Sequence, residues 1–150
     1  MSKNNLLTVY FLLNSIFLLA QNIDINNIEI ARDSFGIPHI YAKTDMELAY
    51  GLAWAHAEDD FKTIQEAYLA GNSLLSKHVG LRAAPIDFLS QLIRPDDTID
   101  SLYKTIDRKF LKVINGYAEG LNSFANKYPD QVLVKKLFPI NPRNCLLYTS

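Results

Sequence analysis

The sequence predicts an α+β chain that is mainly helical, with an N-terminal β-hairpin. Two short stretches near residue 35 alternate apolar and polar side chains, as half-buried strands do. Two longer stretches carry apolar residues at steps of three and four, as amphipathic helices do. Hydrophobic residues make up 49% and charged residues 21% of the chain, as in an ordinary globular domain. The formal charge of −1 argues against a strongly basic nucleic-acid binder, so no nucleic acid is expected as a partner.

The first 20 residues are expected to be a signal peptide. Lys3 precedes an apolar run, and no charged residue follows until Asp24. A short basic start, an apolar core and a small residue at its end are typical of a secretory signal, here with cleavage after Ala20. Asn14 and Ser15 interrupt the run, whereas a spanning helix needs about 20 apolar residues. We therefore expect an exported protein, periplasmic or extracellular, without a stable membrane anchor; an uncleaved anchor is the alternative.

The two alternating stretches span residues 28–33 and 38–43 and are expected to pair as a β-hairpin. The turn between them contains Gly36, which accepts a positive φ. Pro38 has no amide hydrogen to donate, so we expect it at the start of the returning strand or on a sheet edge. His39 is expected to be a hydrogen-bonded structural histidine rather than a catalytic one. Two strands do not make a stable sheet alone, so other structure must complete it.

A long helix is expected from about residue 45 to about residue 70. Thr44 and Glu47 fit a capping box at its start. Small residues on its apolar face let another backbone approach closely, and a carboxylate at the border of this face, Asp59, needs a partner such as Arg32 or a backbone amide. The apolar face comprises Ala49, Ala53, Ala57, Phe61 and Ile64.

Two more helices are expected farther along the chain. The shorter one covers residues 85–93, with Pro85 in its first turn. The longer one covers about residues 101–127, and each of its glycines, Gly116 and Gly120, costs about 1 kcal/mol of helix propensity relative to alanine. We therefore expect tight packing against a neighbour at these glycines. The apolar face of the longer helix comprises Leu102, Ile106, Phe110, Val113, Tyr117, Leu121 and Phe124.

The residues by themselves show no catalytic apparatus. His56 and Asp60 are four apart and could clamp a metal ion, but no third ligand is evident, and the acidic run around Asp60 is more typical of a solvated face. The sequence has neither a Gly-x-Ser-x-Gly nucleophile elbow nor a phosphate-binding glycine loop. The single cysteine, Cys145, excludes an internal disulfide.

Three segments resemble the start of the α subunit in the penicillin acylase (penicillin amidase) family. Residues 30–42 follow the family pattern Asp-x-x-Gly-Ile-Pro-His-Ile, and residues 115–122 resemble its Gly-Tyr-Ala-x-Gly-x-Asn motif. Between them, Gly51, Ala57 and Asp59 match a further motif, in which the next residue here is Asp rather than the family's usual Arg or Asn. Order and spacing agree from about residue 28 to 139, and the local sequence is more similar to members that act on long-chain lactones and lipopeptides.

The resemblance implies an N-terminal-nucleophile hydrolase with an αββα sandwich fold. Such an enzyme is exported as a precursor and cleaved into α and β subunits. The β subunit begins with a serine that attacks a linear amide (N-acyl) bond, with its own α-amine as the base. The implied partners are the β subunit from the same precursor and a small-molecule N-acyl substrate.

The family's catalytic residues fall outside this sequence, so no catalytic, cofactor-binding or metal-binding residue is assigned in it. The calcium ligands of some members also fall outside it, and calcium is expected only in a full-length enzyme. The matched residues are expected to be structural: Gly36 makes the turn, Pro38 and His39 shape the returning strand, and Ala57 and Asp59 pack the first long helix. The full set of motif residues is Arg32, Asp33, Gly36, Pro38, His39, Gly51, Ala57 and Asp59.

Residues 21–143 are thus expected to be the N-terminal part of an acylase α subunit. Residues 144–150 depart from the family pattern and are expected to be a truncation or a non-native extension, in which case Cys145 says nothing about the native protein. The alternative is a small secreted helical binding or interaction module, complete in itself and without catalysis.

Overall fold

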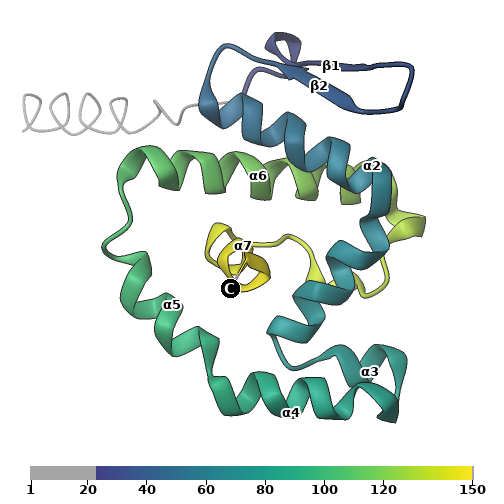
Figure 1. The fold of residues 1–150 in the computed structure, drawn as a ribbon, viewed down its shortest axis with the longest axis vertical. Coiled ribbons are helices and arrows are strands. Elements are labelled where there is room, and N and C mark those ends of the chain that lie inside the picture. Colours follow the sequence, from purple (N-terminus) through teal and green to yellow (C-terminus); the bar gives the residue numbers. More distant parts are fainter. Residues whose placement is uncertain (1–22, 150) are drawn as a thin grey trace, which may run out of the picture.

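The computed structural model describes residues 23–149, in which a β-hairpin lies against one side of a mainly helical body (Figure 1). The expected signal peptide lies outside the described residues. Strands β1 (Glu29–Arg32) and β2 (Pro38–Tyr41) pair antiparallel, with Arg32 opposite Pro38. Gly36 has a φ of 83°, a conformation that glycine adopts without strain. The hairpin and the place of Pro38 at the start of its strand are therefore as predicted.

Helix α2 (Asp45–Gly71) begins with the predicted capping box. Thr44 Oγ1 accepts from the Glu47 amide at 3.2 Å, and the Thr44 amide donates to Glu47 Oε2 at 3.1 Å. The predicted continuous helix is wrong at one point, because Asp60 is non-helical (φ −158°, ψ 72°). Its side chain accepts from the Thr63 amide at 3.0 Å, which caps the second half of the helix. α2 bends visibly along its length (Figure 1).

The second long helix of the sequence analysis divides into α5 (Pro95–Tyr103) and α6 (Arg108–Lys127). The division falls at Asp107, whose side chain accepts from the Lys109 amide at 2.7 Å and caps α6. The predicted apolar face is correspondingly wrong at its N-terminal end, where Leu102 and Phe110 are 54% and 53% exposed. The buried face of α6 comprises Ile114, Gly116, Ala118, Gly120, Leu121, Phe124 and Ala125.

α2 and α6 pack side by side and form the centre of the fold (Figure 1). Gly116 and Gly120 lie at the contact, as expected. A Cβ atom on Gly116 would collide with the carbonyl of Met46, and one on Gly120 would lie 2.5 Å from the Tyr50 carbonyl oxygen and 2.8 Å from Ala53 Cβ. The two backbones therefore approach so closely that only glycine fits at these positions.

The region between α2 and α6 forms an arc of shorter helices, α3 (Leu75–Val79), α4 (Ala84–Ile93) and α5. α4 matches the predicted helix, whereas α3 was not predicted. Its own N-cap residue, Leu74, provides no side-chain acceptor. Asp87 of α4 supplies one instead, because its carboxylate accepts from the Leu75 and Ser76 amides at 2.9 and 2.8 Å. Asp87 is only 6% exposed, so this acceptor joins two helices within the fold.

Two buried amide side chains hold the C-terminal segment on the helices. Gln65 of α2 is fully buried, donates to the Gln131 carbonyl at 3.0 Å and accepts from the Leu133 amide at 2.8 Å. Asn122 of α6 exchanges two hydrogen bonds with the backbone of Ile140, at 2.7 and 2.9 Å. They position the last helix, α7 (Pro142–Thr149), against α2 and α6.

The 3₁₀ turns of the described chain are Ile25–Asn27, Leu81–Ala83, Pro129–Gln131 and Lys135–Leu137.

We predict that Gly116→Ala destabilises the fold. The added methyl group meets the backbone of Met46, which cannot move aside as a side chain could. Overpacking costs about 1–3 kcal/mol, which outweighs the gain in helix propensity of about 1 kcal/mol. Urea unfolding of the purified protein measures the change. Glu119→Ala, at an exposed site in the same helix, is the control and should change stability little; equal stability of the two variants would contradict the packing argument.

We predict that Asp87→Ala lowers the free energy of unfolding by about 1–3 kcal/mol at neutral pH, because two amides at the start of α3 lose their acceptor. Burial opposes ionisation of Asp87, but the hydrogen bonds from Ser76 and Leu75 together outweigh it, so its pKa is lowered. This carboxylate therefore stabilises the fold above its unfolded-state pKa of about 3.9, and the stabilisation is lost as pH falls through the lower folded-state value. Unfolding measured from pH 6 to pH 2 should depend less on pH in the variant. Asp130→Ala, at an exposed aspartate, should leave the profile unchanged.

Candidate functional site

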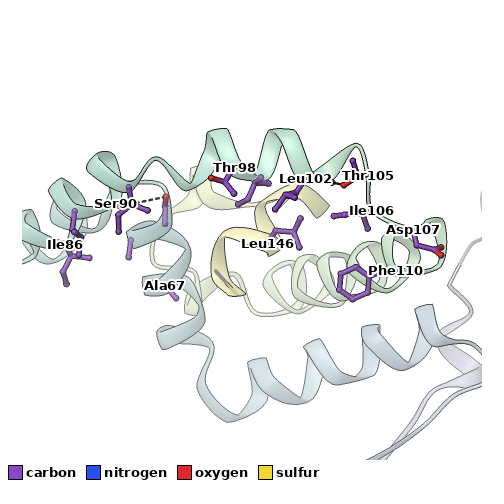
Figure 2. A pocket seen from close by; sticks show the side chains of 15 residues that line it. Ala67, Ile86, Ser90, Thr98, Leu102, Thr105, Ile106, Asp107, Phe110 and Leu146 are labelled. Atoms are coloured by element: carbon purple, nitrogen blue, oxygen red, sulfur yellow. Dashed lines mark hydrogen bonds between the residues drawn. The ribbon is translucent and has the colours of Figure 1, made fainter.

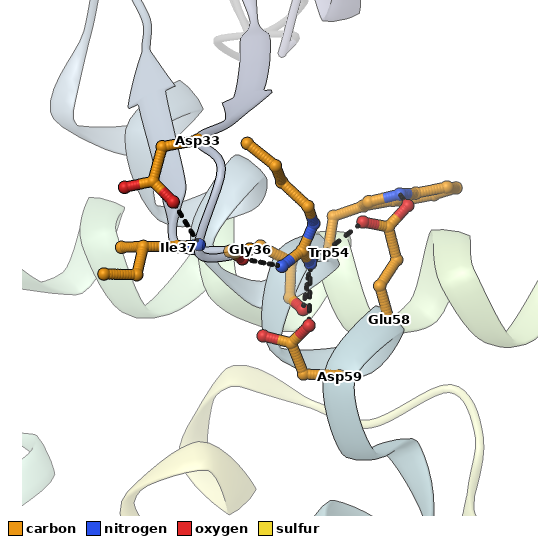
Figure 3. Close-up of polar contacts among 8 residues, drawn as sticks. Asp33, Gly36, Ile37, Trp54, Glu58 and Asp59 are labelled. Atoms are coloured by element: carbon orange, nitrogen blue, oxygen red, sulfur yellow. Dashed lines mark hydrogen bonds and ion pairs between the residues drawn. The ribbon is translucent and has the colours of Figure 1, made fainter.

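A charged cluster joins the hairpin turn to α2 and contains several of the predicted motif residues (Figure 3). Arg32, the last residue of β1, donates from Nη1 to the Gly36 carbonyl at 2.8 Å. Its Nη2 lies 2.8 Å from Asp59 Oδ1 and 3.3 Å from Glu58 Oε2. The hydrogen bond to Asp59 is the largest effect that raises the pKa of Arg32. The expected pairing of Asp59 with Arg32 is present, although the Asp59 side chain is 53% exposed rather than buried.

The carboxylate of Asp33 organises the turn itself. Asp33 Oδ1 accepts from the amides of Phe35 and Ile37 at 2.9 and 3.0 Å. Its Oδ2 lies 3.4 Å from His39 Nε2 on the opposite strand. The hydrogen bond from the Ile37 amide is the largest contribution that lowers the pKa of Asp33. The side chain of His39 is 52% exposed, and these contacts link it to the turn rather than to a substrate pocket.

The remaining motif residues lie elsewhere. Ala57 is buried in the core between α2 and α6, and Pro38 is half-buried at the start of β2. Gly51 lies where α2 faces the hairpin, and a Cβ atom there would come within 2.7 Å of Ile40 Cγ2. The motif thus divides into a charged cluster at the turn and three other positions, of which Gly51 and Ala57 are close-packed and Pro38 begins β2. It does not bring a nucleophile and a base together in the described part of the chain.

The side chains of His56 and Asp60, the possible metal clamp of the sequence, contact other residues in the structure. His56 Nδ1 lies 3.1 Å from Tyr117 Oη, and Asp60 Oδ2 accepts from Thr63 Oγ1 at 2.6 Å. Residues 23–149 contain no group of three or more His, Cys, Asp or Glu side chains that could hold a metal ion. Within the same range, no helix is long and apolar enough to cross a membrane.

An apolar groove of about 920 Å³, which the sequence did not predict, lies at the inner side of the helical arc (Figure 2). Its walls come from α2, α4, α5, the start of α6, and Leu146 of α7. The sequence shows that α4 carries its large apolar residues on one wide face, opposite Asp87, Ser90 and Gln91. It does not show that this face lines a groove. The apolar lining comprises Ala67, Ala70, Ile86, Leu89, Ile93, Ile99, Leu102, Ile106, Phe110 and Leu146.

We predict that Arg32→Lys loosens the hairpin while leaving the α2–α6 core intact. A lysine has one ammonium group and cannot hold the Gly36 carbonyl and two carboxylates in the planar fork geometry of arginine. Amide hydrogen exchange should become faster in β1, β2 and the turn, with little change in α6. Arg108→Lys, at an exposed site in the first turn of α6, is the matched control. Unchanged exchange in the hairpin would show that the cluster does not hold it.

Comparison with known proteins places these features in a family. A family model described as penicillin amidase matches residues 27–145. Acyl-homoserine lactone acylase QuiP from Pseudomonas fluorescens is 24% identical over 106 residues, which cover 71% of this chain and 13% of that protein. Penicillin G acylase from Escherichia coli is 25% identical over 114 residues, which cover 74% of this chain and 14% of that protein.

A solved structure is similar as well. The thermostable penicillin G acylase from Alcaligenes faecalis superposes with a TM-score of 0.65 at 19% identity, covering 81% of this chain and 69% of the matched chain. The present chain spans only 13–14% of the length of the relatives named above. The family match nevertheless covers most of the chain, including the hairpin, α2 and α6. The chain belongs to the penicillin amidase family.

Proposed function

We propose that this chain is the N-terminal part of the α subunit of an exported acylase precursor, which hydrolyses a linear amide bond in an N-acyl substrate. The observation that carries the proposal is the family match over residues 27–145. The similarity in fold to the Alcaligenes penicillin G acylase supports it independently. Relatives named as acyl-homoserine lactone acylase and penicillin G acylase support the proposed substrate class.

In the proposed reaction, the N-terminal serine of a β subunit attacks the amide carbonyl. The α-amine of that serine takes the hydroxyl proton, which suits an amine with an ordinary pKa of about 7.7–8.0. The α-amine passes this proton to the amide nitrogen, the amine of the substrate leaves, and an acyl-enzyme forms. Water then hydrolyses the acyl-enzyme, which releases the acid and restores the serine hydroxyl. Backbone and side-chain donors of the β subunit stabilise the oxyanion.

The contribution of this chain to that reaction is a scaffold. The turn cluster around Arg32 fixes the hairpin on α2, and the glycine contact fixes α2 on α6. A rigid pair of helices with an attached hairpin can support catalytic groups that come from another part of the precursor. We propose no cofactor-binding or metal-binding role for the residues of this chain.

A small secreted binding module without catalysis is the second candidate. The observation that favours it is the apolar groove, which can hold a partner without any chemistry. The two candidates differ in one respect that can be measured, which is whether the gene product acts on amide bonds.

The test is expression of the complete coding sequence, followed by mass spectrometry of the purified product and an assay with N-acyl substrates. We expect two subunits, with a serine at the start of the second, and hydrolysis of a phenylacetyl amide or a long-chain N-acyl homoserine lactone. Replacement of that serine by alanine should abolish turnover, which makes it the matched control. Residues 21–150 alone should show no turnover. Measurable hydrolysis by this segment, or a full product that neither matures nor hydrolyses either substrate, would overturn the proposal.

A further inference from the structure

The apolar groove is unusual because its walls remain open to solvent within the described part of the chain. Leu89, Ile93, Leu102 and Phe110 line it and are 53–65% exposed. Large apolar side chains scattered singly over a surface are ordinary, but a contiguous group of them marks an interaction site. Figure 2 shows Leu102 of α5, Phe110 of α6 and Leu146 of α7 around one space.

Three of the four polar side chains in the lining, all except Thr98, are hydrogen-bonded to the protein itself. Ser90 Oγ donates to the Gly71 carbonyl at 3.1 Å, and Thr105 Oγ1 donates to the Leu102 carbonyl at 2.8 Å. Asp107, the one ionisable residue of the lining, accepts from the Lys109 amide. These groups do not point to recognition of a charged or strongly polar ligand. The occupant that fits the groove is therefore an apolar surface.

The extent of the apolar face favours a polypeptide over a small molecule. Small-molecule sites enclose most of their ligand within a concave pocket. Here the face continues around α4 beyond the groove, to Phe88 and Leu92, which are 67% and 68% exposed. A ligand seated in the groove would leave these two side chains in water. A folded segment lying along α4 and α5 would cover both the groove and its outer edge.

We propose that this face of α4 and α5, together with the groove, docks the downstream part of the same precursor, which the chain is expected to contact as its β subunit. The inference rests on the proposed function. Its physical support is that this chain spans only 13–14% of the length of the relatives compared above, so that most of an enzyme of that size is available to cover the face. The charge-poor lining is what a permanent subunit interface requires.

Cysteine labelling in the full-length precursor tests the proposal. Leu89→Cys places a thiol in the groove, and Leu92→Cys places one on its outer edge. Cys145 is only 6% exposed, and burial raises its pKa, so its own reaction with a maleimide should be slow. The unsubstituted precursor gives the background rate. Lys62→Cys, at a side chain that is 69% exposed on α2, is the control.

The rate of labelling in the native precursor is compared with the rate in urea. We expect protection of both leucine positions by more than about tenfold, against less than about threefold at position 62. Labelling of positions 89 and 92 as fast as position 62 would overturn the proposal. It would also be overturned if protection rose with protein concentration, which indicates a second copy, or if position 89 became protected only on addition of N-decanoyl homoserine lactone.

The two proposals fail in different ways. A precursor that hydrolyses N-acyl substrates but leaves positions 89 and 92 reactive refutes the docking surface alone. A product that protects these positions but shows no hydrolysis refutes the proposed acylase activity and leaves the interface in place. The two leucines are both more than half exposed, so replacement by cysteine should not disturb the core, and circular dichroism of each variant checks this.

Discussion

The close contact between α2 and α6 is the constraint on which the other features depend. At Gly116 and Gly120, the backbone of α6 lies against the carbonyls of Met46 and Tyr50. Such an approach needs small residues on both helices, and on α2 the small residue at this contact is Ala53. The glycines lower the helix propensity of α6, and the packing of the larger residues around the contact offsets that loss. A side chain at either glycine would separate the helices and open the core.

The hairpin and the C-terminal segment are both attached to this pair of helices by polar contacts. Arg32 links the hairpin turn to the middle of α2, directly before the bend at Asp60. Gln65 and Asn122, one on each helix, hold residues 131–140 through hydrogen bonds to their backbone. A fully buried amide such as Gln65 is stable only when its hydrogen bonds are made. These contacts specify where the irregular segments lie, in a way that apolar packing alone would not.

The arc from α3 to α5 is held differently. Asp87 joins α3 to α4, and Ser90 joins α4 to the end of α2. The apolar residues of the arc are largely exposed rather than buried. Ile86, Phe88 and Leu92 of α4 are 49%, 67% and 68% exposed. The arc and the α2–α6 pair thus differ in packing. The helix pair forms its own core, whereas the arc carries the surface that we propose as a docking site.

Local signals in the sequence determined the hairpin, the start of α2 and the position of α4, because a turn glycine, a capping box and a proline in a first turn act on neighbouring residues. They also predicted the glycine contact, and they gave Arg32 as one of two alternative partners for Asp59. The break at Asp107, the bend at Asp60 and the helix α3 were decided by tertiary structure. An aspartate within a helical pattern can either continue the helix or cap a new one, as Asp60 and Asp107 do here. Helix α3 depends on hydrogen bonds to Asp87, which lies eleven or twelve residues farther along the chain. The groove was beyond sequence reasoning for the same reason, since periodicity shows that a face is apolar but not whether the fold buries it.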